Sequence, residues 1–275
     1  IPKIVFTSKG KERITINKKT KKRIKALMIV HTFGNAVNIE KIIKICKEKN
    51  ISIVEDAAES LGTFYNSGKY KNRHTGTVGL IGCLSFNGNK IITAGGGGMI
   101  LTNDSKIASK ARYLISQAKN DSLFYVHDEI GYNYKLNNLQ ASLGLSQFYK
   151  LDSYLKNKKK IHNRYKLNVN KISYLRITQG PIYSSNNHWL NILEIDRDLN
   201  ERKFKKIIKE FHKNNIGVRP LWKPNHLQKI YLKNQQYKLK YINEIYFKRI
   251  CLPSSPNLTI KDQNFICSKI AKILI

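Results

Sequence analysis

The sequence has few cysteines and no long apolar run, and each absence excludes a kind of protein. Four cysteines occur in 275 residues, widely spaced, without a Cys-x-x-Cys pair or a histidine at ligand spacing. A zinc site and a disulfide framework are therefore not expected, and free thiols are typical of the reducing cytoplasm. No apolar run reaches about eighteen residues, so no membrane-spanning helix is predicted. Charged residues interrupt the amino-terminal stretch, so no signal peptide is predicted there.

Acidic residues are also scarce. The 18 Asp and Glu stand against 50 Lys and Arg, which gives a formal net charge of +32. A charge of this size is typical of nucleic-acid-binding proteins. The basic residues are spread along the chain, however, with dense clusters only at 18–23 and 156–160. No helix-turn-helix, RNP or zinc signature accompanies them, so the sequence predicts no specific nucleic-acid partner.

Short apolar runs alternate with helical patterns in the first half of the chain. Uninterrupted apolar strands between helices predict an α/β fold with a mostly parallel central sheet and helices on both faces. In such sheets ligands bind beyond the carboxyl ends of the strands. The strands are predicted at 26–30, 51–54, 82–86 and 98–102, and the helices at 39–47 and 107–118.

The second half of the chain has a different pattern. One long helix is predicted from Asn138 towards Tyr165, followed by a strand at 189–195 and a helix at 204–212. We place a domain boundary near Lys150. Residues 1–150 are then a large cofactor-binding α/β domain, and residues 151–275 a small α+β domain.

A carboxylate and a lysine stand in the order that a pyridoxal phosphate enzyme requires. Asp56 follows the strand predicted at 51–54, and Lys90 lies between Ser85 and the glycine run Gly95–Gly98. The lysine would form a Schiff base with the cofactor aldehyde, and the aspartate would hold the proton on the pyridine nitrogen. Taken singly, Lys90 fits an ordinary surface lysine and Asp56 fits a helix cap. Their combination favours the cofactor.

Six sequence blocks in a fixed order extend this match. They are 30–34, 55–62, 85–98, 131–141, 219–226 and 251–255. Through them the chain resembles the sugar-nucleotide aminotransferases of the DegT/DnrJ/StrS group, which are fold-type I pyridoxal phosphate enzymes. Blocks 85–98 and 127–133 are most similar to the branch that makes 4-amino sugars on the bacillosamine and legionaminic acid routes. Family members start earlier, so the resemblance implies a fragment that lacks their amino-terminal phosphate-binding turn.

The resemblance also implies roles for four further residues. Glu59 matches the position beside the phenolic oxygen of the cofactor, where relatives often carry Gln or His, and Ser85 matches the serine that binds the phosphate. Asn133 matches an asparagine that reaches the phosphate of the neighbouring subunit, so the active site would be shared across a homodimer. His226 resembles a histidine near the sugar nucleotide. The structural alternatives are a strand-end hydroxyl for Ser85, a turn residue for Asn133 and a buried structural histidine for His226.

By resemblance, the chain is expected to be a cytoplasmic aminotransferase for amino-sugar and surface polysaccharide synthesis. It would move an amino group from an amino acid, usually glutamate, to the ketone of a nucleotide-linked keto-deoxysugar. The positive charge would steer that anionic substrate. Two alternatives stay open. A dehydratase-type relative uses the same cofactor but carries His where this chain has Lys90. The other alternative is a basic regulatory or nucleic-acid-binding protein on a degenerate aminotransferase fold.

Overall fold

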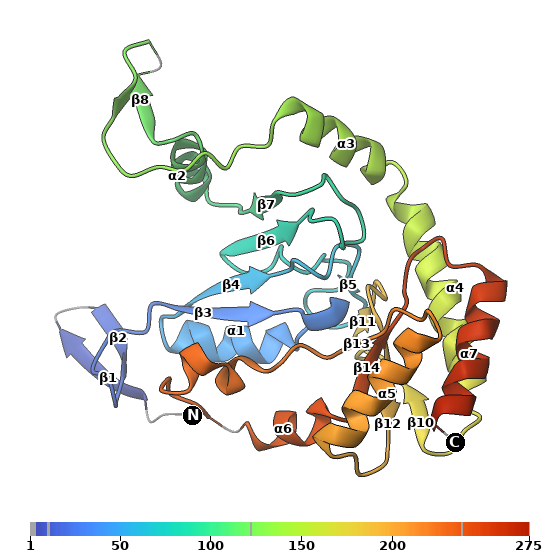
Figure 1. Cartoon of the computed structure of the whole chain (residues 1–275). Helices are drawn as coiled ribbons and strands as arrows, with labels where there is room; N and C mark the ends of the chain where they lie inside the picture. Colours follow the sequence, from blue (N-terminus) through green and yellow to red (C-terminus); the bar gives the residue numbers. More distant parts are fainter. Residues whose placement is uncertain (1–3, 10–11, 122, 238, 275) are drawn as a thin grey trace. The chain divides into compact units, whose positions relative to one another are not determined.

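Two compact units make up the chain in the computed structural model (Figure 1). The larger unit runs to Ser153 and takes in Gly180–Asn187, and the smaller unit comprises Tyr154–Gln179 and the residues from His188 onward. No sequence pattern indicated the return of Gly180–Asn187 to the larger unit. The functional division at Lys150 stays a prediction. The structure describes residues 4–9, 12–121, 123–237 and 239–274.

A four-stranded sheet forms the centre of the larger unit (Figure 1). Its order is β3 (Ala26–Val30), β4 (Ser52–Asp56), β6 (Ile81–Ser85) and β7 (Gly98–Leu101). The first three strands are parallel, as predicted, whereas β7 runs antiparallel to β6. Residues 86–97 join β6 to β7 without a helix. A parallel neighbour needs a crossover connection, usually helical, so this loop instead returns the chain antiparallel. The mixed α/β fold is confirmed, with its last strand reversed.

Helix α1 (Ile39–Glu48) packs on one face of this sheet. Ile29 of β3 and Ile53 of β4 are buried there in one cluster with Cys46 of α1. Side chains alternate along a strand, so Met28 and Val30 lie on the opposite face. Their exposed fractions are 65% and 43%. Over β3, the described helices therefore cover one face, although helices were predicted on both.

The smaller unit is built on an antiparallel sheet, in agreement with the predicted α+β composition. The strand order is β10 (Leu175–Ile177), β12 (Asn191–Ile195), β14 (Arg249–Leu252) and β13 (Arg219–Pro220). Its core joins these strands to three helices, α4 (Leu151–Val169), α5 (Glu201–Lys213) and α7 (Ile260–Leu274). The largest fully buried side chains of this core include Tyr165, Phe211, Leu193, Ile250 and Ile270.

The single helix predicted from Asn138 to Tyr165 is wrong, because the structure divides it into α3 (Asn138–Phe148) and α4. Asn137 and Gln140 form a capping box that starts α3. At its other end the Lys150 N–H donates to the Gln147 carbonyl, three residues back. Such a bond tightens a terminal turn and ends α-helical geometry.

The remaining elements are short. None of the described helices is both long and apolar enough to cross a membrane. The other strands are β1 (Ile4–Lys9), β2 (Glu12–Asn17), β5 (Phe64–Tyr65), β8 (Lys119–Asp121), β9 (Val126–His127) and β11 (Ser184–Ser185). The other helices are η1 (Thr32–Gly34), α2 (Ser105–Ile115), η2 (Asn225–Leu227), η3 (Lys229–Tyr231) and α6 (Lys240–Tyr246).

Candidate active site

Asp56 and Ser85 lie at the carboxyl ends of two neighbouring strands. Asp56 ends β4 and Ser85 ends β6, and the register pairs Asp56 with Cys83. Since side chains alternate, Asp56, Cys83 and Ser85 belong to the same face of the sheet. The Asp56 carboxylate accepts a hydrogen bond from the Ala58 N–H at 3.0 Å. Residues 57–80 contain no helix, so the alternative of Asp56 as a helix cap is excluded.

Lys90 lies in a closed loop between β6 and β7. The loop is tied at its base, because the Phe86 N–H donates to the Gly97 carbonyl at 3.0 Å and the Ala94 N–H donates to the Phe86 carbonyl at 2.9 Å. Lys90 itself is half-buried. Gly97 has a φ of +81°, a left-handed conformation that favours glycine. The glycine run therefore lets the chain turn sharply back into β7 behind the lysine.

Glu59 interacts electrostatically with both Asp56 and Lys90. Burial raises the pKa of the Glu59 carboxyl, and the negative charge of Asp56 adds to this effect. A hydrogen bond from the Phe33 N–H, 2.7 Å from Oε2, and the positive charge of Lys90 oppose it. The structure thus places Glu59 within electrostatic reach of both Asp56 and Lys90. These are three of the residues that the sequence singled out.

A buried, hydrogen-bonded pair of side chains supports the site from the other side of β4. The Nε2 atom of His31 lies 2.9 Å from the carboxylate of Glu55, and neither side chain is exposed to solvent. Glu55 also accepts backbone hydrogen bonds from Gly76 at 2.9 Å, Val78 at 2.7 Å and Gly79. Burial alone would raise the pKa of Glu55, but the hydrogen bonds from His31 and these three N–H groups outweigh it and lower the pKa. Sequence reasoning missed this pair, although a glutamate in an apolar strand is a signal for it.

An open cavity of about 960 Å³ contains two of the predicted phosphate ligands. Ser85 and Asn133 both line it, although they are far apart in sequence. Arg112 of α2 and Lys135 line it as well, and sequence reasoning named neither of them. Hydroxyl, amide and guanidinium groups are suited to binding a phosphate. Whether Asn133 serves its own subunit or a partner stays a prediction.

The predicted cofactor fits this set of residues. A half-buried lysine and a carboxylate at a strand end lie within electrostatic reach of Glu59, and the predicted phosphate ligands line a cavity on the same sheet face. Pyridoxal phosphate requires an amine, an acidic partner for its ring nitrogen and an anion site. Among the described residues, no group of three His, Cys, Asp or Glu is placed to hold a metal ion.

Lys158 is a second unusual lysine, and it belongs to the smaller unit. It is 4% exposed, and burial lowers its pKa to about 8. Its Nζ atom donates to the Trp189 carbonyl at 3.0 Å and to the Ser254 carbonyl at 2.6 Å. Because the Lys158 amine donates both bonds to backbone carbonyls, we assign it a structural role. The half-buried His226 lies in η2 of the same unit, and its predicted role near the sugar nucleotide stays a prediction.

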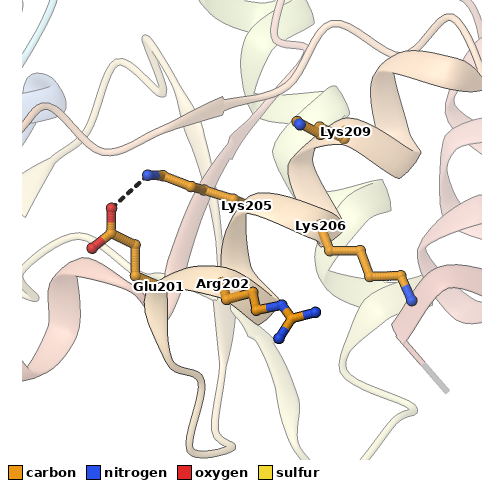
Figure 2. Close-up of a pocket in the computed structure, with 5 residues that line it drawn as sticks. All are labelled: Glu201, Arg202, Lys205, Lys206 and Lys209. Carbon is orange, nitrogen blue, oxygen red and sulfur yellow. Dashed lines mark ion pairs between the residues drawn. The ribbon is translucent and has the colours of Figure 1, made fainter.

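The exposed side of α5 gathers basic residues that look dispersed in the sequence. Figure 2 shows Arg202, Lys205, Lys206 and Lys209 around an open cavity of about 640 Å³ in the smaller unit. The single acid is Glu201, which pairs with Lys205 at 2.6 Å. The spacing of three and four residues places these cations on one side of the helix. With no acid besides Glu201 in its lining, this cavity is basic and differs in kind from the Asp56–Lys90 site.

Comparison with known proteins identifies relatives over most of the chain. The sequence model of the DegT/DnrJ/EryC1/StrS aminotransferase family matches residues 11–271. A Bacillus subtilis protein named "Putative pyridoxal phosphate-dependent aminotransferase EpsN" is 38% identical over 87% of this chain and 61% of its own length. The GDP-perosamine synthase of Escherichia coli O157:H7 is 31% identical over 93% of this chain and 67% of its own. The chain therefore spans about three fifths to two thirds of these relatives.

Solved structures show the same fold. An aminotransferase of this group from Brucella abortus superposes with a TM-score of 0.82, at 24% identity, over 94% of this chain and 66% of its own. Helicobacter pylori PseC, titled as an aminotransferase of pseudoaminic acid biosynthesis, gives a TM-score of 0.80 at 25% identity over 91% of this chain and 67% of its own. The predicted resemblance to this group is thereby confirmed.

The Glu55–His31 pair leads to a prediction about stability. Glu55→Gln removes the carboxylate that accepts hydrogen bonds from His31 and from three backbone N–H groups, and leaving a buried donor unpaired costs about 1–3 kcal/mol. The free energy of unfolding, measured by urea titration with circular dichroism, should fall accordingly at pH 7. The matched control is Glu129→Gln, which removes the exposed pair with Lys110 and should cost about 1 kcal/mol or less.

The pH dependence of this loss has a defined sign. Because the pKa of Glu55 is lowered in the folded state, its contribution is present above the ordinary value of 4.5 and is lost as the pH falls through the folded pKa. The difference between wild type and Glu55→Gln should therefore shrink below about pH 4.5. An equal loss of stability from both substitutions at pH 7 would contradict this account.

Proposed function

Because the chain belongs to the DegT/DnrJ/EryC1/StrS aminotransferase family, we propose that it forms the catalytic part of a sugar-nucleotide aminotransferase. The cofactor of this family is pyridoxal phosphate. The single observation that carries the proposal is the electrostatic grouping of Lys90, Asp56 and Glu59 at the carboxyl ends of the parallel strands. Such an edge is where α/β sheets bind their ligands.

Lys90 has two tasks in this proposal. Its amine would hold the cofactor at the aldehyde group. The same amine would act as general acid and base, accepting and returning the proton at Cα of the amino donor. Pyridoxal phosphate would supply an electron sink for the charge at Cα. The tied loop from Phe86 to Gly97 fixes the backbone that carries Lys90.

Asp56 and Glu59 act on different atoms. The Asp56 carboxylate holds a proton on the ring nitrogen, which keeps the ring able to accept electrons. Glu59, held by the Phe33 N–H, is assigned to the side of the phenolic oxygen. Ser85, Asn133 and Arg112 line the cavity assigned to the phosphate. Asn133 would serve the partner subunit of a homodimer, as a two-fold interface supplies each site reciprocally.

The substrate is proposed as a nucleotide-linked keto-deoxysugar, with glutamate as the amino donor. The names of the relatives support this class, since GDP-perosamine synthases and UDP-linked altrosamine transaminases are among them. The formal charge of +32 supports it as well, because a strongly basic protein attracts a nucleotide diphosphate from solution. His226 is assigned to the sugar-nucleotide side of the site. A cytoplasmic location follows from the supply of such substrates.

The assignment of Lys90 predicts where the cofactor attaches. Borohydride reduction of protein loaded with pyridoxal phosphate, followed by peptide mapping, should place the pyridoxyl group on Lys90. Lys90→Ala should abolish the label. Lys106→Ala, at an exposed lysine of the same unit, should leave the label unchanged. A label on Lys158 in the wild-type protein would refute the assignment.

The role of Asp56 predicts a loss of turnover without a loss of folding. Asp56→Asn retains the Ala58 hydrogen bond but cannot hold the ring proton by charge, so kcat should fall by roughly 10²-fold or more. Cofactor binding, followed by its visible absorbance, should largely persist. Asp104→Asn is the matched control, because Asn also caps α2 and the site is not touched. Turnover close to wild type in Asp56→Asn would show that another group holds the proton.

A second candidate function rests on the basic surface of α5. Its cations in Figure 2 would attract the phosphates of nucleic acid. We expect this attraction to be non-specific, since no recognition motif accompanies it. Binding to duplexes of unrelated sequence should be equal and should fall steeply between about 50 and 200 mM salt. Tight binding at physiological salt with a preference for one sequence would instead favour the regulatory alternative.

A further inference from the structure

The segment Gly180–Asn187 packs into the larger unit beside the candidate site. Its strand β11 pairs with β5 in antiparallel register, Ser184 with Tyr65 and Ser185 with Phe64. The hydroxyl of Tyr183 donates to the Ala36 carbonyl at 3.2 Å. The segment ends at Asn187, which is 2% exposed. A buried polar side chain at this point requires hydrogen-bond partners.

Those partners are in the backbone around Glu59. The amide nitrogen Nδ2 of Asn187 donates to the Glu59 carbonyl at 2.8 Å and to the Leu61 carbonyl at 2.9 Å. The backbone N–H of Asn187 donates to Oγ1 of Thr63 at 3.2 Å. Three bonds from one residue thus hold the turn that carries Glu59. They come from more than 120 positions later in the sequence.

Asn187 also lies against the turn η1, which contains the residue that donates to the Glu59 carboxylate. The Glu59 carboxylate is bound by the Phe33 N–H, and Phe33 has a φ of 57° in the turn η1. Gly34, the next residue, has a φ of +80°, and a Cβ atom there would lie 1.9 Å from Oδ1 of Asn187. The carbonyl of Gly34 in turn accepts from Oγ1 of Thr63 at 2.9 Å. The Asn187 side chain therefore binds the backbone of Glu59 and lies against Gly34, the residue after the one that donates to the Glu59 carboxylate.

We propose that Asn187 is a positioning residue, which holds the Glu59 carboxyl in place towards Lys90 and the cofactor bound to it. The inference rests on the proposed function, because it requires that Lys90 carry the cofactor. Asn187 does not contact the reacting atoms in this arrangement. It acts through Glu59, so its effect must appear in the visible absorbance of the cofactor bound to Lys90.

The readout follows from the charges. The negative charge of Glu59 and the positive charge of Lys90 attract each other. The wavelength of the visible absorbance of pyridoxal phosphate bound to a lysine depends on the charges beside the cofactor ring. If Glu59 is displaced, this wavelength should move in the same direction as in Glu59→Gln, a change that a purely structural role would not produce.

The test compares Asn187→Ala with Glu59→Gln and with a neighbouring control in the purified, cofactor-loaded protein. In Asn187→Ala the wavelength of the visible absorbance should move towards the value of Glu59→Gln. Ser185→Ala removes a hydroxyl of the same segment that donates to the Phe64 carbonyl at 3.3 Å, and it should leave the wavelength unchanged. In the Glu59→Gln background, Asn187→Ala should add no further shift.

The outcomes separate this inference from the function on which it rests. Circular dichroism of the cofactor-free variants establishes folding, and Asn187→Ser, which keeps a single donor, replaces Asn187→Ala if the latter fails to fold. A visible absorbance wavelength equal to wild type in the folded Asn187 variant overturns the inference alone. A shift that persists in the Glu59→Gln background also overturns it, because Asn187 would then act by another route. Absence of the visible band in wild-type protein refutes the proposed function itself.

Discussion

The carboxylate of Glu55 is the group on which the geometry of the larger unit depends. It is fully buried, and it accepts hydrogen bonds from His31 after β3 and from Gly76 and Val78 before β6. One side chain of β4 thereby fixes the chain segments next to both neighbouring strands. Asp56 is the following residue and points to the opposite face. The position of Asp56 is therefore set by the network beneath it, which stays out of contact with solvent.

On the face of the sheet that carries Asp56, the candidate site contains partly buried groups of opposite charge. Glu59 is affected by the charges of Lys90 and Asp56. Its carboxylate accepts a hydrogen bond from the Phe33 N–H, and its carbonyl accepts one from the side chain of Asn187. Interactions between charges are stronger there than in water, because the surrounding dielectric constant is lower. The position of Glu59 therefore determines how strongly it interacts with these two groups. Asn187 bears no charge, but it contributes to this position through its hydrogen bond to the Glu59 carbonyl.

The sequence predicts the strands of this site well and their connections less well. The bounds of β3 were predicted because an unbroken apolar run has only one reasonable assignment. The reversal of β7 was missed, since the apolar pattern of a buried strand carries no information on its direction. The break between α3 and α4 was also missed. Helical periodicity continues through Tyr149 and Lys150, and only the hydrogen bonds show that the helix ends there.

Among the candidate site residues, the sequence singled out those with a distinctive local context and missed those defined by long-range contacts. Lys90 and Asp56 stand in recognisable surroundings, a glycine run and a strand end. Asn187 contacts Glu59 and Leu61 across more than 120 residues, and Arg112 meets Ser85 only at a shared cavity. An asparagine in a loop and an arginine on a helix have no local signature for such contacts. They become visible only when the segments are placed in space.

The most direct measurement of the central claim is a crystal structure of the protein grown with pyridoxal phosphate. The account predicts continuous electron density from Nζ of Lys90 into the cofactor, with the ring nitrogen beside the carboxylate of Asp56 and the phosphate near Ser85. Density that joins the cofactor to Lys158, or an ordered cofactor whose ring nitrogen lies away from Asp56, would contradict it.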